Sequence, residues 1–361
     1  MTQPTDAPPA GFLAELKDAV TTRAALLVLG VLALQLAFIT SYVGAFHDPE
    51  PSEIPLAVTA PAAAAAAARS AQQLDALPGK PLDAHTVQNE AAARAQIENR
   101  EVDGALIIDP AGTTDRLLVA SGGGASLSQA LAAVVSRVEQ SQGRDLRITD
   151  VVPAAPGDAR ALSAFYLVIG WCVGGYLCAA ILAISAGARP ANPHRALIRL
   201  GVLLAYAVVA GLLGTVIAGP VLGALPGSIT ALWGLGTLVV FSVGAITLAF
   251  QGLAGVVGIG LAILVVVVFG NPSAGGAYPY PLLPPFWKAI GPALPPGAGT
   301  YAARSIAYFR GNDALGSFLV LAGWAVLGTV ATVACALWRR DRADAPRPER
   351  GATPAGEHPG A

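Results

Sequence analysis

Long apolar stretches alternate with polar segments along most of the chain. Six of these stretches are long enough to cross a bilayer, which takes about 20 predominantly apolar residues in a helix. None of the six contains Asp, Glu, Lys or Arg. The pattern therefore predicts six transmembrane helices. They cover residues 24–46, 162–186, 200–218, 229–250, 252–270 and 314–338.

The polar segment between the first two spans, residues 47–160, has a different pattern. Short apolar runs, typical of strands, alternate with stretches in which apolar residues recur at helical spacing. Such alternation predicts a layered α/β domain. The predicted strands cover residues 54–58, 81–85, 105–108, 116–120 and 146–152, and the predicted helices cover residues 62–77, 87–100 and 127–138.

The expected fold is an α-helical polytopic membrane protein with six transmembrane helices and an α/β extracytoplasmic domain inserted between helices 1 and 2. Before the last helix, residues 271–313 form a Pro-rich external loop, since prolines exclude one regular helix there. The predicted parts are a cytoplasmic amphipathic N-terminus (1–23), transmembrane helix 1 (24–46), the α/β domain (47–160), a five-helix transmembrane region with that loop (161–338) and a disordered cytoplasmic tail (339–361).

Composition supports a membrane protein. Hydrophobic residues make up 54% of the 361 residues and charged residues only 12%, whereas soluble domains carry about 25% charged residues. This excludes an ordinary cytosolic enzyme and an intrinsically disordered protein. The net charge of -1 provides no basic field for nucleic acid.

Lys and Arg near the span ends indicate the orientation, because cytoplasmic loops carry an excess of them. With the N-terminus inside, the inner segments carry ten Lys or Arg, and the outer loop between spans five and six carries three. Both termini are therefore expected in the cytoplasm. The first span has an alternative interpretation as a cleaved signal peptide, with residues 43–45 as the cleavage site. Its length and the 23 residues before it favour an uncleaved anchor.

The sequence lacks the motifs of enzymes and metal sites. It has no nucleotide-binding, serine-hydrolase or metalloprotease motif, and its four histidines are scattered. We expect no catalytic residue, no cofactor and no metal. Spans free of carboxylates and histidines also argue against coupling to protons or sodium. The glycines 122–124, followed by Ser126, suit either a phosphate loop or a turn with Ser126 as a helix N-cap, and the missing Lys-Ser/Thr pair favours the turn.

Glycines in the predicted spans suggest close helix packing. Gly170 and Gly174 are four residues apart in the second span, and several glycines crowd the fifth. Small residues at such spacing allow two helix backbones to approach. Two interpretations remain open, a face between two copies of the chain and the internal packing of one bundle.

Two segments resemble a known family. Residues 95–110 (AQIENREVDGALIIDP) place a helix before an apolar strand that ends at a proline, and residues 282–296 (LLPPFWKAIGPALPP) form a Pro-rich stretch before the last span. With the order of one span, an external domain and five spans, the chain is similar to ABC-2 type membrane permeases. The likeness is greatest to the phage-infection-protein (Pip-like) group and the nitrosoguanidine-resistance type.

The resemblance implies an export-type permease in a bacterial plasma membrane, often a homodimer and sometimes assembled with a separate ATP-binding subunit. It also implies that residues 187–199 form a coupling loop and that residues 12–20 form a gate helix on the inner membrane surface. Positive-inside charge and an interfacial anchor explain the same two segments without any partner. The candidate coupling residues are Arg189, Arg195 and Arg199, and the candidate external gate residues are Phe286, Trp287 and Lys288.

Two functions follow from these features. The first is a permease subunit that exports a hydrophobic or amphipathic compound, with membrane lipid around it. The alternative is a membrane scaffold or receptor that transports nothing and whose external domain binds an envelope or secretion-system partner. An external enzyme is a third class, and residues 47–160 contain no catalytic constellation to support it.

Overall fold

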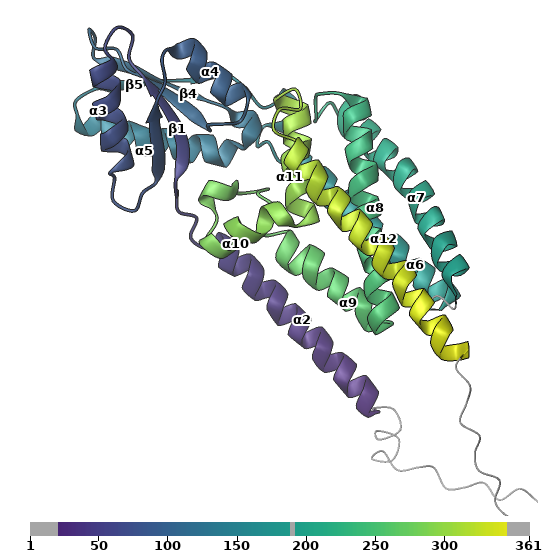
Figure 1. Ribbon diagram of the computed structural model, residues 1–361. Coiled ribbons are helices and arrows are strands. Elements are labelled where there is room, and N and C mark those ends of the chain that lie inside the picture. The colour runs from purple at the N-terminus through teal and green to yellow at the C-terminus, as the bar shows by residue number, and fades with distance from the viewer. Residues whose placement is uncertain (1–20, 188–191, 345–361) are drawn as a thin grey trace, which may run out of the picture.

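The computed structural model describes residues 21–187 and 192–344 (Figure 1). The predicted gate helix and Arg189 lie outside these residues, as does the tail from residue 345. The described part is mostly helical and contains one small mixed sheet. Five of its helices are long and apolar enough to cross a membrane, which makes the chain a multi-pass membrane protein.

The long helices pack around α8. Of the most apolar stretch of α8, 56% is buried, because α6, α7 and α12 all pack against it, whereas only 6% of the corresponding stretch of α2 is buried. Side chains of Asn192 and Ser228 cap the first turns of α7 and α8, so both helices begin at these residues. The five are α2 (Thr22–Phe46), α6 (Ser163–Ala186), α7 (Pro193–Val216) with its π-helical extension η3 (Ile217–Val221), α8 (Ile229–Ala254) and α12 (Leu315–Asp344).

The fifth predicted span is wrong in its boundaries and its length. The predicted boundary between spans 229–250 and 252–270 lies inside α8, which continues to Ala254 and ends at Gly255 with a φ of 65°. A left-handed residue of this kind is a common helix terminator. After it, α9 (Val257–Ile263) and the π-helical segment η4 (Leu264–Gly270) form one shorter apolar helix, below the length of the other five.

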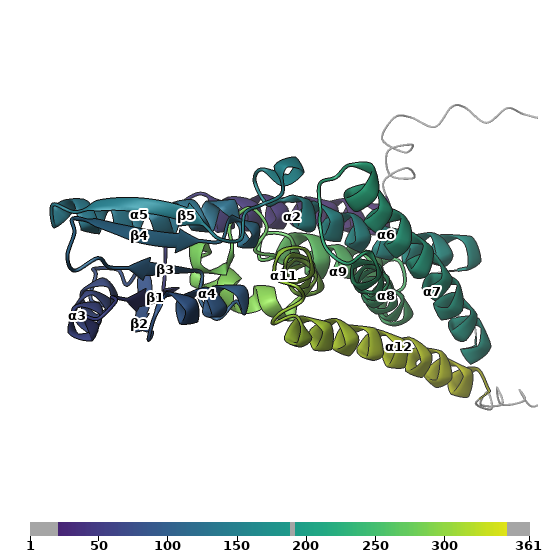
Figure 2. The same ribbon diagram turned by 90° about the horizontal axis from the view of Figure 1, so that it is seen from above.

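A five-stranded sheet forms the core of the segment between α2 and α6, as predicted. The strand order is β2-β1-β3-β4-β5, and every pair is parallel except β3 with β4. Helices α3 and α5 pack on one face, and α4 covers the other (Figure 2). The strands are β1 (Ile54–Thr59), β2 (Leu82–Thr86), β3 (Gly104–Ile107), β4 (Thr114–Val119) and β5 (Asp145–Asp150), and the helices are α3 (Ala64–Asp75), α4 (Glu90–Glu98) and α5 (Ala125–Ser141).

The Pro-rich segment folds into short helices. Five of its eight prolines stand in the first turns of these helices, where a missing N–H costs nothing, so they start helices as well as interrupt them. The last and longest is buried against α6, α8 and α12. The helices are η5 (Tyr280–Leu282), α10 (Pro285–Ile290), η6 (Gly291–Ala293) and α11 (Pro295–Tyr308).

The glycine run forms a tight turn against α11. A Cβ on Gly122 would lie 2.7 Å from the Tyr308 ring, so only glycine fits this contact. The expected N-cap is wrong, because Gly124 precedes α5 and the Ser126 hydroxyl instead donates to the Ala277 carbonyl at 2.7 Å.

The expected start of the disordered tail at residue 339 is also wrong, since α12 continues to Asp344.

Candidate functional site

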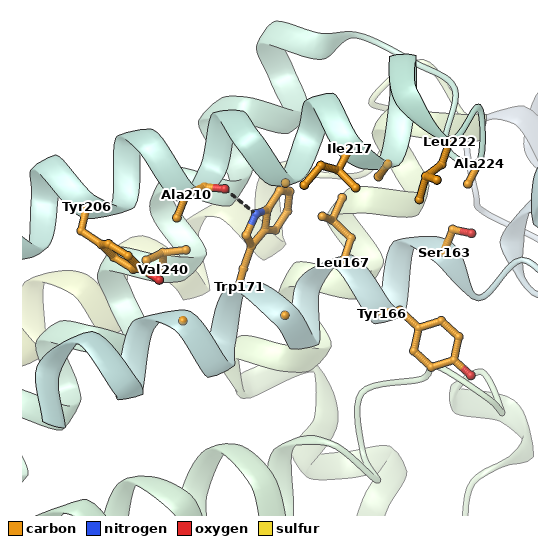
Figure 3. Close-up of a pocket in the computed structure, with 14 residues that line it drawn as sticks. Ser163, Tyr166, Leu167, Trp171, Tyr206, Ala210, Ile217, Leu222, Ala224 and Val240 are labelled. Atoms are coloured by element: carbon orange, nitrogen blue, oxygen red, sulfur yellow. Dashed lines mark hydrogen bonds between the residues drawn. The ribbon is translucent and has the colours of Figure 1, made fainter. Parts of the chain in front are cut away.

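An apolar groove runs between α6 and α7 (Figure 3). It has a volume of about 500 Å³ and is lined by side chains of both helices, by η3 and by Val240 of α8. At one end the Tyr206 side chain points from α7 towards α6, and at the other end lie Ile217, Leu222 and Ala224. None of its lining residues is charged, and its polar side chains are those of Ser163, Tyr166, Trp171 and Tyr206, so the groove suits binding of a largely apolar molecule.

Trp171 forms the closed side of the groove. Its indole N–H donates to the Ala210 carbonyl of α7 at 3.3 Å, and the ring is 4% exposed. Glycines make room for it, because a Cβ on Gly214 would lie 2.4 Å from the indole nitrogen and one on Gly236 would lie 2.5 Å from the ring. The indole is therefore held by packing and by a satisfied hydrogen bond.

Two glycines of α6, Gly170 and Gly174, line the groove without contributing side chains to it. A Cβ on Gly174 would lie 2.9 Å from the Tyr206 hydroxyl, so a larger residue there would displace the end of the Tyr206 side chain. A Cβ on Gly170 meets nothing within 4 Å, so its missing side chain leaves open space. Of this pair only Gly174 faces α7 within the chain, whereas Gly170 leaves open volume, so the two earlier interpretations of their spacing both stay predictions.

The groove opens to the outer surface of the helices. Tyr166, Ile217 and Leu222, all in its lining, are 63%, 52% and 65% exposed. Figure 3 shows the Tyr166 ring turned away from the groove. Apolar side chains exposed on a helix of this length face lipid in a membrane, so the groove is open on that side of the helices.

The predicted coupling residues differ in their exposure and their hydrogen bonds. Arg195 is exposed in the first turn of α7, whereas Arg199 is 5% exposed and donates to the Gly187 carbonyl at 2.7 Å, at the end of α6. Arg189, the third, lies between the two described ranges. Arg199 thus ties α7 back onto α6, and Arg195 is the one presented at the surface.

The predicted gate residues lie together on α10 but also differ. Phe286 is 55% exposed, whereas Trp287 is buried against Ala45 at the end of α2. Lys288 pairs with Glu53 at 3.3 Å, ahead of the first strand. Helix α10 therefore joins α2, η4 and the α/β domain at one point.

Compared with protein-family models, curated proteins and solved structures, the chain has no match.

Sequence reasoning missed the groove itself. Gly170 and Gly174 are visible in the sequence, but Trp171, Tyr206 and Gly214 come together only once α6 and α7 are paired. A tryptophan beside two glycines on one span was the available signal, because a large ring and small residues on one face indicate a shaped contact. No group of three or more His, Cys, Asp or Glu that could hold a metal ion occurs in residues 21–187 and 192–344.

Proposed function

We propose that the chain is a membrane permease subunit of the ABC-2, Pip-like type and that it exports a hydrophobic or amphipathic compound. The observation that carries this proposal is the groove between α6 and α7, which is apolar, free of charge and open to the bilayer side. A ligand there gains burial against Trp171 and Leu167 and meets few groups that need hydrogen bonds. Membrane lipid is then both the surroundings and the source of the substrate.

In this proposal the α/β domain is extracytoplasmic and both termini are cytoplasmic, in the plasma membrane of a bacterium. The excess of Lys and Arg on the proposed inner side supports the orientation. The energy for export would come from a separate ATP-binding subunit in contact with Arg195, and a homodimer would bring two such subunits together. The chain's own spans offer no carboxylate that could couple export to protons.

Filling the groove tests the proposal directly. Gly170→Leu places a side chain into open space, so the fold tolerates it while the groove loses volume. Gly201→Leu is the matched control, because Gly201 is an exposed glycine of α7 outside the groove and a Cβ there also meets nothing within 4 Å. The measurement is efflux of Nile red, a neutral lipophilic dye, from preloaded cells that carry equal amounts of each variant.

We expect cells with the wild-type chain or with Gly201→Leu to release the dye several-fold faster than cells with Gly170→Leu. Equal efflux for the wild type and Gly170→Leu would contradict a transport role of the groove. A pull-down in mild detergent tests the partner separately. A nucleotide-binding subunit that is lost on Arg195→Glu supports the permease, whereas envelope proteins held through the α/β domain, without any ATPase, support the alternative scaffold or receptor.

A further inference from the structure

A second, polar cavity lies where the α/β domain meets the short helices of the Pro-rich segment. It has a volume of about 230 Å³. Charged and phenolic side chains from five separate segments line it, so it exists only in the assembled chain. Those that matter for its chemistry are Arg100, Asp103, Tyr280, Lys288, Tyr301 and Arg304.

Arg304 of α11 is a buried cation with an unsatisfied donor. It is 3% exposed, and its terminal nitrogens donate to the carbonyls of Gly275, Gly276 and Ala161 at 2.5, 2.8 and 3.1 Å. Its Nε has no hydrogen-bond partner, and no carboxylate among the described residues lies within 4.0 Å of its nitrogens. A buried charge normally finds a paired charge, so this side chain lacks a counter-anion.

Arg100, just after α4, brings a second cation to the same cavity. Its guanidinium lies 3.6 Å from the centre of the Tyr301 ring and donates to the Tyr301 carbonyl at 3.0 Å and to the Ser305 hydroxyl at 2.6 Å. Within the described ranges, no ion pair involves Arg100 either. The Tyr301 stack and these bonds fix its orientation without neutralising it.

The acidic residues of the cavity do not balance these cations. Glu53 is occupied by its pair with Lys288 at 3.3 Å. Asp103 is the remaining carboxylate in the lining, and burial raises its pKa to about 6. With Glu53 and Lys288 neutralising each other, the lining residues Arg100, Arg304 and Asp103 leave an excess of one positive charge above that pKa and two below it. Asp313 and Asp158 act electrostatically on Arg100 and Arg304, but they lie outside the lining and form no ion pair with either arginine.

Tyr280 adds a donor that the protein leaves unused. Its hydroxyl is buried and has no hydrogen-bond partner in the described chain. A buried hydroxyl without a partner is uncommon in folded proteins and calls for an explanation. Together with the Arg304 Nε, it gives the cavity two donors that have no hydrogen-bond partner in the described chain.

From this juxtaposition we infer that the cavity binds a phosphate-type oxyanion through Arg100, Arg304 and the Tyr280 hydroxyl. Guanidinium groups are the preferred partners of phosphate oxygens, because their N–H groups match two oxygens at once. The anion is either free in solution or the headgroup of a lipid, and both present the same tetrahedral group. This site shares no lining residue with the apolar groove, so anion binding can be tested independently of the proposed export.

The first test is calorimetric titration of the purified full-length protein with inorganic phosphate. We expect saturable binding by the wild type, about tenfold weaker binding by Arg100→Gln, and a loss of a few-fold for Tyr280→Phe. Tyr280→Phe removes a hydroxyl that has no hydrogen-bond partner in the described chain, so it breaks no hydrogen bond of the fold and remains informative even if Arg100→Gln is unstable. Arg137→Gln, an exposed arginine of α5 in the same domain, is the matched control and keeps wild-type affinity.

Lipid nanodiscs distinguish the two sources of the anion. If the anion is a headgroup, phosphatidic acid in phosphatidylcholine nanodiscs copurifies with the wild type and displaces phosphate. If it is free phosphate, the titration is the same with and without phosphatidic acid. Absence of both phosphate binding and phosphatidic acid retention in the wild type would overturn the proposal, and so would equal affinity of the wild type and a folded Tyr280→Phe variant.

The pH dependence gives a second readout, with sulfate as a probe whose charge stays constant. As the pH falls from 8 to 5, Asp103 takes up a proton and sulfate binding by the wild type tightens. Asp103→Asn binds tightly at both pH values, and a wild-type affinity that does not change with pH would contradict the role of Asp103. The charged and titratable groups that face the cavity are Glu53 before β1, Arg100 and Asp103 after α4, Tyr280 of η5, Lys288 of α10, and Tyr301 and Arg304 of α11.

Discussion

A buried carboxylate of the α/β domain shows how one residue depends on its neighbours. Glu139 of α5 is 4% exposed and lies beside Asp115, which already holds Arg144 through two hydrogen bonds of 2.6 Å. Burial, followed by the proximity of Asp115, raises the pKa of Glu139 to about 7, because its charged form loses water and meets a like charge. The folded state therefore retains a proton on Glu139 that the unfolded chain releases at lower pH.

We predict that Glu139→Gln stabilises the domain at high pH. A carboxyl group whose pKa is raised on folding loses stability as the pH rises from its unfolded value, 4.5, to its folded value, about 7. Glutamine resembles the protonated form, so it avoids this loss. The expected gain in unfolding free energy is about 1–3 kcal/mol at pH 8 and smaller at pH 5. Hydrogen exchange of α5 in the full-length protein measures it.

Glu98→Gln, an exposed carboxylate of the same domain, is the control for Glu139→Gln and leaves exchange unchanged at both pH values. A Glu139→Gln variant that destabilises α5 at pH 8 would refute the sign of the effect.

For single residues, the sequence shows whether a side chain is charged or apolar, but it predicts poorly whether that side chain is buried. The absence of charge in the spans was visible at once. By contrast, Arg304 lies in a Pro-rich segment that predicts exposure, yet it is 3% exposed. Nothing local to Arg304 reports that α11 is inserted between α6, α8 and α12, because that burial comes from residues far away in the chain.

Among the elements, α2 is the least attached to the rest. Its contacts are with η4 and α10, and a hydrogen bond of 2.8 Å joins Asn271 to the Tyr42 hydroxyl near its end. The exposed apolar side chains along its length leave it free to contact lipid or a second copy of the chain.

We predict that Asn271→Leu loosens this end of α2. One interhelical hydrogen bond contributes about 1 kcal/mol in a membrane, so the linker at residues 47–53 should exchange hydrogen a few-fold faster. Tyr42→Phe should have the same effect, since it removes the other partner of the bond. Asn312→Leu, which loses bonds to Glu98 and Asn99 instead, serves as the control. Unchanged exchange in both Asn271→Leu and Tyr42→Phe would show that ring packing alone holds α2.

For helices and strands, the hydrophobic pattern predicted the type of element well and its boundaries poorly. All five strands were predicted within a few residues. β1 and β3 are short apolar runs, whereas the edge strands β2 and β5 are mostly polar and were recognised by their place between turns and helices. The end of α8 was not, because an apolar run continues through Gly255 and only the backbone turn at that glycine divides it. The prolines of α10 and α11 were interpreted as breaks, although a proline in a first turn equally starts a helix.

For the whole molecule, the short helix formed by α9 and η4 decides the topology. It is too short to match the other five, yet it returns the chain from the far end of α8 towards α10 (Figure 1). If it crosses the membrane, both ends of the chain lie on the same side, as proposed. If it turns back within the membrane, they lie on opposite sides.

Cysteines introduced at Thr22 and Ala343, near the two ends of the described chain, test this in a background with Cys172, Cys178 and Cys335 replaced by serine. We predict that a membrane-impermeant maleimide fails to label either of them in intact cells and labels both after lysis. Ser141→Cys, in the α/β domain, should react in intact cells. Labelling of only one of the two end positions would require an odd number of crossings.

The joint between the α/β domain and α11 has a consequence for folding during synthesis. Arg100 reaches its partners on α11 across 201 and 205 residues of chain, so these bonds cannot form until almost all of the protein has left the ribosome. The sheet and its three helices are synthesised long before that, and Leu282 and Phe309 of the later segment then complete their hydrophobic cores. Closure of this joint is therefore a late, slow step, because contacts so distant in sequence carry a large entropic cost. The polar cavity is among the last features of the protein to exist.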